Sequence, residues 1–390
     1  MTNTKRIKSI PFSLPHLEKE ELNEVVDSLK SGWITTGPKV QYFEKEFSKY
    51  IGAKHVVAVN SCTAALHLAL DAIGLKERDE VIIPTITFAS TGEVITYFKA
   101  NPILIDCEQD TLLLDVNKIE EKINQKTKAI IPVHFAGQAC QMDGILQIAR
   151  KYNLKIIEDA AHSLPTKYKG NMIGTLGDIT CFSFYATKTI TTGEGGMACS
   201  ENNRFANRMK IMSLHGISKD AWKRYTSEGS WYYEIIDAGY KYNMTDISAA
   251  LGLAQLKKCN KFYQKRKQIG YKYTQAFKEI PLIKTPVVKE YGTHAWHLYV
   301  IQLNLEMLKI NRTQFIEKMK DAGIGCSVHF IPLHFHPYYK KTFGFKPKGF
   351  PVASYVYERI VSLPIYPKMT DEDVDYVIDN VIKIIKENRK

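Results

Sequence analysis

The feature that most constrains the fold is the alternation of short apolar runs with helical patterns through the N-terminal half of the chain. The apolar runs that predict strands span residues 55–59, 80–83, 103–105, 128–133, 154–157, 179–184 and 196–199. Helices are predicted at 17–30, 63–73 and 142–152, and Gly32 and Gly74 stop the first two. Short apolar strands separated by helices are typical of an α/β domain with a mainly parallel sheet.

The pattern changes after Leu256. A strongly basic helix is predicted at 257–272, then a strand at 297–303, a helix at 313–322 and a strand at 326–330. A last helix is predicted to begin at Thr370, with Asp373 three residues later as its capping partner. We therefore expect two domains, residues 1–256 and a smaller α+β domain at 257–390. The length of 390 residues and the hydrophobic content of 45% are enough for both.

Composition narrows the classes of protein. No run of 18 apolar residues occurs, so no transmembrane helix is expected, and the N-terminus lacks the apolar core of a signal peptide. Seven cysteines without a Cys-x-x-Cys pair indicate free thiols in a reducing cytoplasm. The net charge of +12 fits either an anionic ligand or a basic surface without a specific partner. No nucleic-acid motif occurs, so no nucleic-acid partner is expected.

Polar residues follow the predicted strand at 55–59, and a helix is predicted directly after them. Ligands bind at the carboxyl ends of the strands in parallel α/β sheets. Backbone N–H groups at the start of a helix, together with the hydroxyls of Ser61 and Thr63, suit a phosphate. Ordinary capping of the helix by Ser61 or Thr63 explains the same residues. Both interpretations stay open on this segment alone.

Asp159 is an acidic residue at the end of the predicted strand 154–157. A carboxylate there could keep a pyridinium nitrogen protonated, so that the ring accepts electrons. The alternative is a helix cap. His162 lies three residues later and could orient the carboxylate, although a single histidine is more often structural.

Lys188 follows the predicted strand 179–184 and precedes a turn rich in Thr and Gly, with no acidic neighbour at helical spacing. Partial burial in such a setting lowers the pKa of a lysine and suits it to form a Schiff base with an aldehyde cofactor. Ser183 lies five residues earlier and offers a further hydroxyl for a phosphate. An amine, a pyridinium partner and a phosphate site at one sheet edge together indicate pyridoxal phosphate.

The chain resembles the DegT/DnrJ-type nucleotide-sugar aminotransferases over nearly its whole length, and most closely the branch that makes spore-coat polysaccharide sugars and 4-amino-4-deoxy-arabinose. The segments that carry the resemblance are 31–40, 60–66, 132–137, 158–162, 183–196, 239–246 and 327–332. The resemblance implies fold type I of the pyridoxal-phosphate transferases, with a mainly parallel seven-stranded sheet, flanking helices and a smaller C-terminal α+β domain.

The resemblance also implies roles at the cofactor. Lys188 would bind the cofactor aldehyde and shuttle protons, and Asp159 would pair with the pyridine nitrogen, with His162 beside it. The phosphate would be held by Ser183, Thr63 and the backbone of Cys62. Phe88 matches the position that stacks on the ring. Asn243 would reach the phosphate from the neighbouring subunit of a homodimer.

Three further residues are predicted to contact the substrate. His329 lies in a segment that faces the sugar nucleotide in the family, and Arg224, in an aromatic stretch before Gly239, is a candidate phosphate contact. Many relatives have Asn and Arg where this chain has Lys241 and Asn243, which alters substrate contacts more than chemistry. His329, His334 and His336 match no standard zinc spacing, so no metal is expected.

The expected protein is therefore a cytoplasmic, homodimeric aminotransferase with no membrane partner. It would move an amino group from glutamate to a nucleotide-linked keto-deoxy sugar, with C4 favoured on resemblance, for cell-surface polysaccharide synthesis. One rival is a pyridoxal-phosphate-dependent sugar dehydratase, whose members replace the lysine with histidine. The other is a regulatory homologue without turnover. Lys188 argues against the dehydratase, and Lys188 together with Asp159 argues against the regulatory homologue. The sequence does not name the sugar or the nucleotide.

Overall fold

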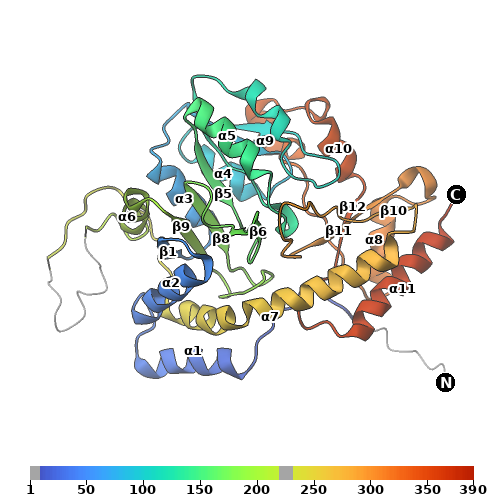
Figure 1. Ribbon diagram of the computed structural model, residues 1–390, viewed down its shortest axis with the longest axis horizontal. Helices are drawn as coiled ribbons and strands as arrows, with labels where there is room; N and C mark the ends of the chain where they lie inside the picture. The colour runs from blue at the N-terminus through green and yellow to red at the C-terminus, as the bar shows by residue number, and fades with distance from the viewer. Residues whose placement is uncertain (1–8, 219–231) are drawn as a thin grey trace.

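A central seven-stranded sheet organises the N-terminal two thirds of the protein (Figure 1). The computed structural model describes residues 9–218 and 232–390. The strand order is β1-β9-β8-β5-β4-β2-β3, and only β9 runs antiparallel to its neighbours β1 and β8. The strands are β1 His55–Val59, β2 Glu80–Pro84, β3 Asn101–Ile105, β4 Thr127–Ile130, β5 Lys155–Asp159, β8 Ile179–Ser183 and β9 Gly196–Ser200. The predicted mainly parallel seven-stranded α/β sheet is confirmed.

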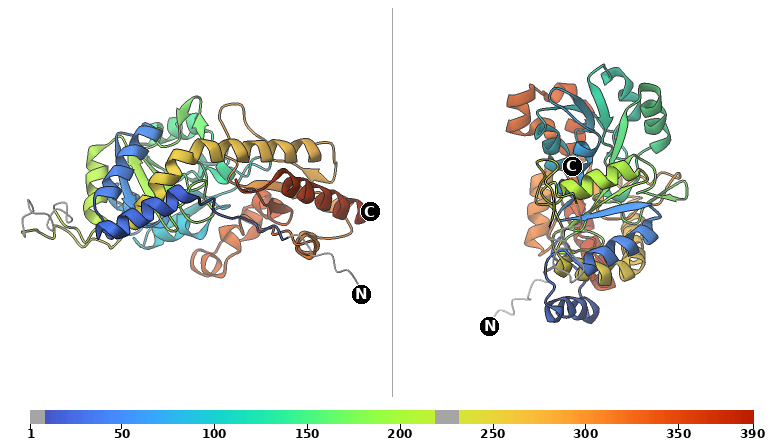
Figure 2. Two further views of the ribbon diagram at one scale, coloured as in Figure 1. Left: turned by 90° about the horizontal axis from the view of Figure 1, so that it is seen from below. Right: turned by 90° about the vertical axis from the view of Figure 1, so that its left-hand side faces the viewer.

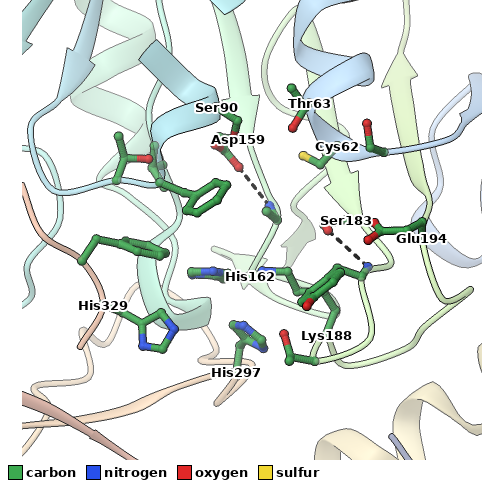
Figure 3. A pocket seen from close by; sticks show the side chains of 18 of the residues that line it. Cys62, Thr63, Ser90, Asp159, His162, Ser183, Lys188, Glu194, His297 and His329 are labelled. Atoms are coloured by element: carbon green, nitrogen blue, oxygen red, sulfur yellow. Dashed lines mark hydrogen bonds between the residues drawn. The ribbon is translucent and has the colours of Figure 1, made fainter. Parts of the chain in front are cut away.

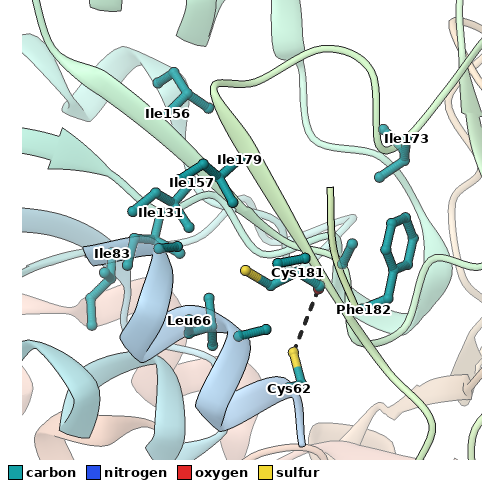
Figure 4. Packing of buried hydrophobic residues seen from close by; sticks show 14 of the residues in the cluster. Cys62, Leu66, Ile83, Ile131, Ile156, Ile157, Ile173, Ile179, Cys181 and Phe182 are labelled. Carbon is teal, nitrogen blue, oxygen red and sulfur yellow. Dashed lines mark hydrogen bonds between the residues drawn. The ribbon is translucent and has the colours of Figure 1, made fainter. Parts of the chain in front are cut away.

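Helices flank this sheet, and α3 packs against β8, β9 and the helices α4 and α6. The helices of this part are α1 Lys19–Ser31, α2 Pro38–Ile51, α3 Cys62–Ala72, α4 Ala89–Thr96, α5 Met142–Tyr152 and α6 Asn203–Met212. Figure 4 shows the core between α3 and the sheet, where Leu66 meets Ile83, Ile131 and Ile157. Continuous apolar strands of this kind are typical of a sheet that is buried on both faces.

Helix α7, Asp246–Phe277, runs for 32 residues from beneath the central sheet to the C-terminal part (Figures 1 and 2). Its N-terminal half packs against α1 and α2. Lys258 on α7 fixes α1 through ion pairs of 2.9 Å each to Glu18, Glu20 and Glu21. Its C-terminal half carries Ile269, Tyr273 and Phe277 into a second hydrophobic cluster.

The C-terminal part is a three-stranded antiparallel sheet with helices around it. Its elements are β10 Ile283–Lys284, β11 Tyr299–Leu303, β12 Ile360–Leu363, α8 Arg312–Asp321, α9 Pro337–Phe343, α10 Pro351–Tyr357 and α11 Asp371–Glu387. Thr370 and Asp373 form the predicted capping box at the start of α11. A small hairpin, β6 Lys167–Tyr168 and β7 Asn171–Met172, lies apart from both sheets.

Two predicted strands need correction. Residues 326–330 form no strand. Their one β-type pairing within the described residues is an isolated bridge between Ser327 and Ser362. The chain leaves the sheet there because His329 and Phe330 line a cavity instead. Strand β4 ends at Ile130 rather than at 133; Pro132 has no N–H group to continue the ladder.

The boundary predicted at residue 256 falls inside α7, and the division into two domains stays a prediction. All seven cysteines are free and six are buried, as expected. Within the described residues, no helix combines the length and the apolar character that crossing a bilayer requires.

Candidate active site

A cavity of about 470 Å³ opens at the carboxyl ends of the central strands (Figure 3). Asp159 ends β5, Ser183 ends β8, and Cys62 and Thr63 begin α3. The C-terminal part closes the other side with His297, His329 and Phe330. The strand ends of the central sheet and loops of the C-terminal part therefore meet around one pocket, which Lys188 also lines.

Lys188 lies in the turn between β8 and β9, where its backbone N–H donates to the Tyr185 carbonyl at 2.9 Å. Desolvation lowers the pKa of its amine from 10.5 to about 8, although Cys62 and Asp159 oppose this shift. No carboxylate in the described part of the chain forms an ion pair with its Nζ. The amine is therefore unprotonated in about a tenth of the molecules at pH 7, far more than for an ordinary lysine.

Asp159 presents a buried carboxylate, 4% exposed, to the same cavity. Its Oδ2 accepts a hydrogen bond from Thr91 Oγ1 at 2.8 Å, and its Oδ1 accepts one from the Ala161 N–H at 3.2 Å. Thr91 in turn bonds Thr87 at 2.7 Å. Burial raises the pKa of Asp159, while the bonds from Thr91 and Ala161 oppose the shift. Because Asp159 ends a strand and no helix begins there, it does not serve as a helix cap.

His162 lines the cavity but does not orient Asp159. Its Nδ1 accepts a hydrogen bond from the Ala136 N–H at 3.3 Å. Its ring lies 5.8 Å from that of Phe330 in a stacked arrangement and 4.4 Å from that of His297. Desolvation holds the pKa of His162 well below 6.5, so the ring is neutral. The side chain that orients the carboxylate is Thr91.

The start of α3 forms a cradle for an anion. Ser61 caps the helix, since its Oγ accepts the Ala64 N–H at 3.0 Å, and it lines the cavity together with Thr63 and Ser183. The Cys62 thiol donates to the Cys181 carbonyl at 3.5 Å, and within the described residues the backbone N–H of Cys62 has no main-chain acceptor. A Cβ on Gly196 would lie 2.5 Å from the Ser61 carbonyl carbon, so only glycine lets β9 approach this turn. Helix N-termini of this kind bind phosphate.

Aromatic rings form the remaining wall. Phe88 lines the cavity and is 60% exposed, with its ring 5.8 Å from that of Phe330. His329 Nδ1 bonds Ser362 Oγ at 2.9 Å, and its ring stacks on Phe12 at 5.3 Å. Burial lowers the pKa of His329 to about 4, so this ring is also neutral.

Two predicted site residues in the described part of the chain, Asn243 and Lys241, do not line this cavity. Asn243 Nδ2 donates to Thr36 Oγ1 at 2.6 Å, beside the end of β1. Lys241 is exposed. Arg224 lies outside the described residues. A role for these three at a neighbouring subunit remains a prediction.

The three histidines weighed as metal ligands have separate partners. His334 bonds Thr85 and Ser354, and His336 bonds the Ile331 carbonyl, while His329 bonds Ser362. In the parts of the chain described, no group of three His, Cys, Asp or Glu side chains is arranged to hold a metal ion.

Sequence reasoning missed Thr91, His297 and Phe12 as lining or supporting residues. Thr91 lies inside a short helix without a distinctive pattern, Phe12 precedes the first helix, and His297 lies just before β11, in the other sheet. An amine, a buried carboxylate and an anion cradle in one cavity fit a pyridine aldehyde that carries a phosphate.

Residues 15–382 match the model of the DegT/DnrJ/EryC1/StrS aminotransferase family. The chain is 51% identical over 383 residues to the spore coat polysaccharide biosynthesis protein SpsC of Bacillus subtilis, which covers 98% of both chains. It is 56% identical over 380 residues to an uncharacterized protein of Methanocaldococcus jannaschii, covering 97% of this chain and 98% of that protein. A putative sugar aminotransferase of Streptococcus pneumoniae, solved in its PMP form, has a TM-score of 0.91 at 36% identity, covering 97% of this chain and 100% of that one. Its PLP form has a TM-score of 0.90 at the same identity, covering 97% of this chain and 99% of that one.

Proposed function

Because the chain belongs to the DegT/DnrJ/EryC1/StrS aminotransferase family, we propose that it is a pyridoxal-phosphate-dependent enzyme that aminates a nucleotide-linked keto-deoxy sugar. The observation that carries the proposal is the convergence of Lys188, Asp159 and the start of α3 on one cavity. Solved PLP and PMP forms of a similar protein support the cofactor.

Each of these residues has a chemical task in the proposal. Pyridoxal phosphate, when bound, supplies a ring that accepts electrons from the carbon that carries the amine. Asp159 would hold a proton on the ring nitrogen, and the Thr91 hydroxyl keeps its carboxylate in place. Lys188 would hold the aldehyde and, once displaced, take a proton from the donor and return it to the product. Thr63, Ser183 and the backbone N–H of Cys62 would bind the phosphate.

Two observations support a nucleotide sugar as the substrate: the net charge of the chain and the names of similar proteins. The net charge of +12 favours the approach of an anionic nucleotide sugar. One similar protein is named for spore coat polysaccharide synthesis and another as a putative sugar aminotransferase. We infer a role in cell-surface polysaccharide synthesis, with glutamate as donor and amination at C4. His329 and Phe88 at the cavity wall are the proposed sugar contacts.

We further propose a cytoplasmic homodimer with shared sites. Asn243 would serve the phosphate of the partner subunit's cavity, and Lys241 and Arg224 would contact the substrate. In support, Asn243 lies beside the end of β1 but not in the cavity of its own chain.

A spectroscopic titration with pyridoxal phosphate tests the proposal. We expect the absorbance band of the lysine-bound cofactor in the wild type and in Lys169→Ala, which alters an exposed lysine outside the cavity. Lys188→Ala should lack the band. Addition of glutamate should bleach it, and a panel of UDP-, GDP-, CDP- and dTDP-linked keto sugars should then restore it and yield an amino sugar by mass. A protein that forms no band would not be an aminotransferase of this type.

A further inference from the structure

Arg266 lies in the middle of α7 and is only 2% exposed, which is rare for a guanidinium. Within residues 9–218 and 232–390, every hydrogen bond of this side chain goes to a main-chain carbonyl, and its Nε has no partner. A buried cation without a carboxylate is costly, and an apolar side chain of similar volume usually avoids that cost. The charge therefore calls for a functional explanation.

The guanidinium joins segments that are far apart in sequence. Nη1 donates to the carbonyls of Ile365 at 2.6 Å, His297 at 3.2 Å and Trp296 at 3.4 Å. Nη2 donates to the carbonyl of Thr187 at 3.5 Å. Thr187 directly precedes Lys188, and His297 lines the same cavity as Lys188. Arg266 thus connects the turn that carries Lys188 to the loop that closes the other side of the site.

The loop that Arg266 holds is strained. Trp296 has a φ of +54°, a conformation that bulky residues seldom adopt. Its N–H donates to His294 Nδ1 at 2.9 Å, and its carbonyl accepts from Arg266. One turn along α7, a Cβ on Gly270 would lie 2.8 Å from the Trp296 ring, so glycine makes room for it. Helix α7 therefore packs closely against this loop at Gly270, and Arg266 holds the loop by hydrogen bonds to its carbonyls.

The charge of Arg266 also acts on Lys188. Asp159 and Cys62 favour the protonated amine, whereas burial and Arg266 disfavour it. Burial lowers the pKa of Arg266 itself only to about 10, so its charge persists at neutral pH. The titratable groups that share the cavity with Lys188 are Cys62, Asp159, His162, Tyr185, Glu194, His297 and His329. Desolvation keeps His162, His297 and His329 neutral by lowering the pKa of each ring, so Arg266 is the cation that opposes Asp159.

We propose that Arg266 is a positioning residue for Lys188, which fixes the turn before the amine and places a permanent positive charge near it. A nearby cation is a recognised way to keep a reactive lysine unprotonated. The inference rests on the proposed function only in taking Lys188 as the reacting amine.

The test follows the pH dependence of Lys188 acetylation by trace acetic anhydride, in the full chain freed of cofactor and read by peptide mass spectrometry. The test variant is Arg266→Gln, whose amide still donates to a carbonyl but carries no charge. The control is Arg359→Gln. Arg359 is also buried with an unpartnered Nε, but it pairs with Glu306 at 2.6 Å and donates to the Tyr355 carbonyl, away from the turn that carries Lys188.

We expect a midpoint at about 8 for the wild type. Arg266→Gln should raise the midpoint by about 0.3–0.5 pH unit, because burial and not Arg266 is the largest cause of the lowered pKa of Lys188; this leaves about two- to threefold less unprotonated Lys188 at neutral pH. Arg359→Gln should keep the wild-type midpoint even where it lowers thermal stability. An unchanged midpoint in Arg266→Gln would overturn the proposal, as would a wild-type midpoint at the ordinary value for lysine.

Should Arg266→Gln fail to fold, Arg266→Met carries the same prediction, and an unchanged midpoint in that variant would likewise overturn the proposal. The acetylation needs no cofactor. A chain that binds no pyridoxal phosphate would therefore contradict the proposed function without deciding the role of Arg266.

Discussion

At the scale of single residues, the site keeps two charges in unfavourable surroundings. Burial lowers the pKa of the Lys188 amine to about 8 and raises the pKa of the Asp159 carboxyl. Both shifts mean that folding is less favourable than it would be with apolar side chains there, because the charged forms lose hydration. Such strain is expected where a lysine must react as a free amine.

Lys188→Met should therefore stabilise the cofactor-free protein. The amine has a lower pKa in the folded chain than in the unfolded chain, so the unfolded state binds more protons between about pH 8 and the value of 10.5. The cost of burying the ammonium is present below pH 8 and is relieved as the pH rises through this window. We expect a gain on the order of 1–3 kcal/mol at neutral pH that shrinks above pH 8.

Denaturant unfolding of both proteins across this pH range checks the prediction. A constant difference at all pH values would show that the gain comes from packing and not from the charge.

Lys188, Asp159 and the phosphate cradle could be predicted because each follows a recognisable strand. Thr91 and Arg266 could not, since their roles come from contacts with residues far away in sequence. The predicted link from His162 to Asp159 was wrong for a related reason. A spacing of three residues does not show which way a ring turns, and His162 bonds Ala136 instead.

At the scale of secondary structure elements, a buried hydrogen-bonded pair supports the strand ends beneath the site. His134 Nε2 and Glu158 Oε2 lie 2.8 Å apart with both side chains fully buried. Glu158 Oε1 also accepts from Thr180 Oγ1 at 2.8 Å and from the Gly177 N–H at 2.7 Å. The pair thereby joins the segment after β4 to β5 and β8, and Glu158 is next to Asp159.

His134→Leu should destabilise the protein by about 1–3 kcal/mol, because it leaves Glu158 Oε2 and the Cys140 N–H buried without this partner. The double variant His134→Leu/Glu158→Leu should lose less free energy of unfolding than the two single variants lose in sum. Removal of the exposed pair Lys151 and Glu120 should cost less than about 1 kcal/mol. Free energies of unfolding from urea titrations provide the comparison, and additive losses would show that the pair is not coupled.

The predicted elements were mostly found, since apolar runs and capping residues mark them locally. The helix expected at 257–272 is part of α7, which begins at Asp246. The earlier start was not predicted because the sequence of the first turns of α7 shows no clear helical period. Residues 326–330, by contrast, were predicted as a strand but form none. Their side chains His329 and Phe330 line a cavity and do not pack in a sheet.

At the scale of the whole molecule, the proposed dimer makes a quantitative prediction. If each site takes Lys188 from one chain and Asn243 from the partner subunit, a mixture of Lys188→Ala and Asn243→Ala chains should regain about a quarter of wild-type activity. Half of the dimers would be mixed, and each would hold one intact site. A mixture of Lys188→Ala with Asp159→Ala should regain nothing, since both residues come from the same chain.

Transaminase assays on co-expressed chains decide the matter. Recovery in neither mixture would argue that Asn243 acts within its own chain, whereas wild-type activity of Asn243→Ala alone would show that it has no part in the site.

The central claim is that the Lys188 amine is the group that binds the cofactor aldehyde. Borohydride reduction of the protein with pyridoxal phosphate, followed by peptide mass spectrometry, tests it most directly. We predict a phosphopyridoxyl group on Lys188 in the wild type and in Lys169→Ala, and none in Lys188→Ala. A label on another lysine, or no label after reduction, would contradict the assignment.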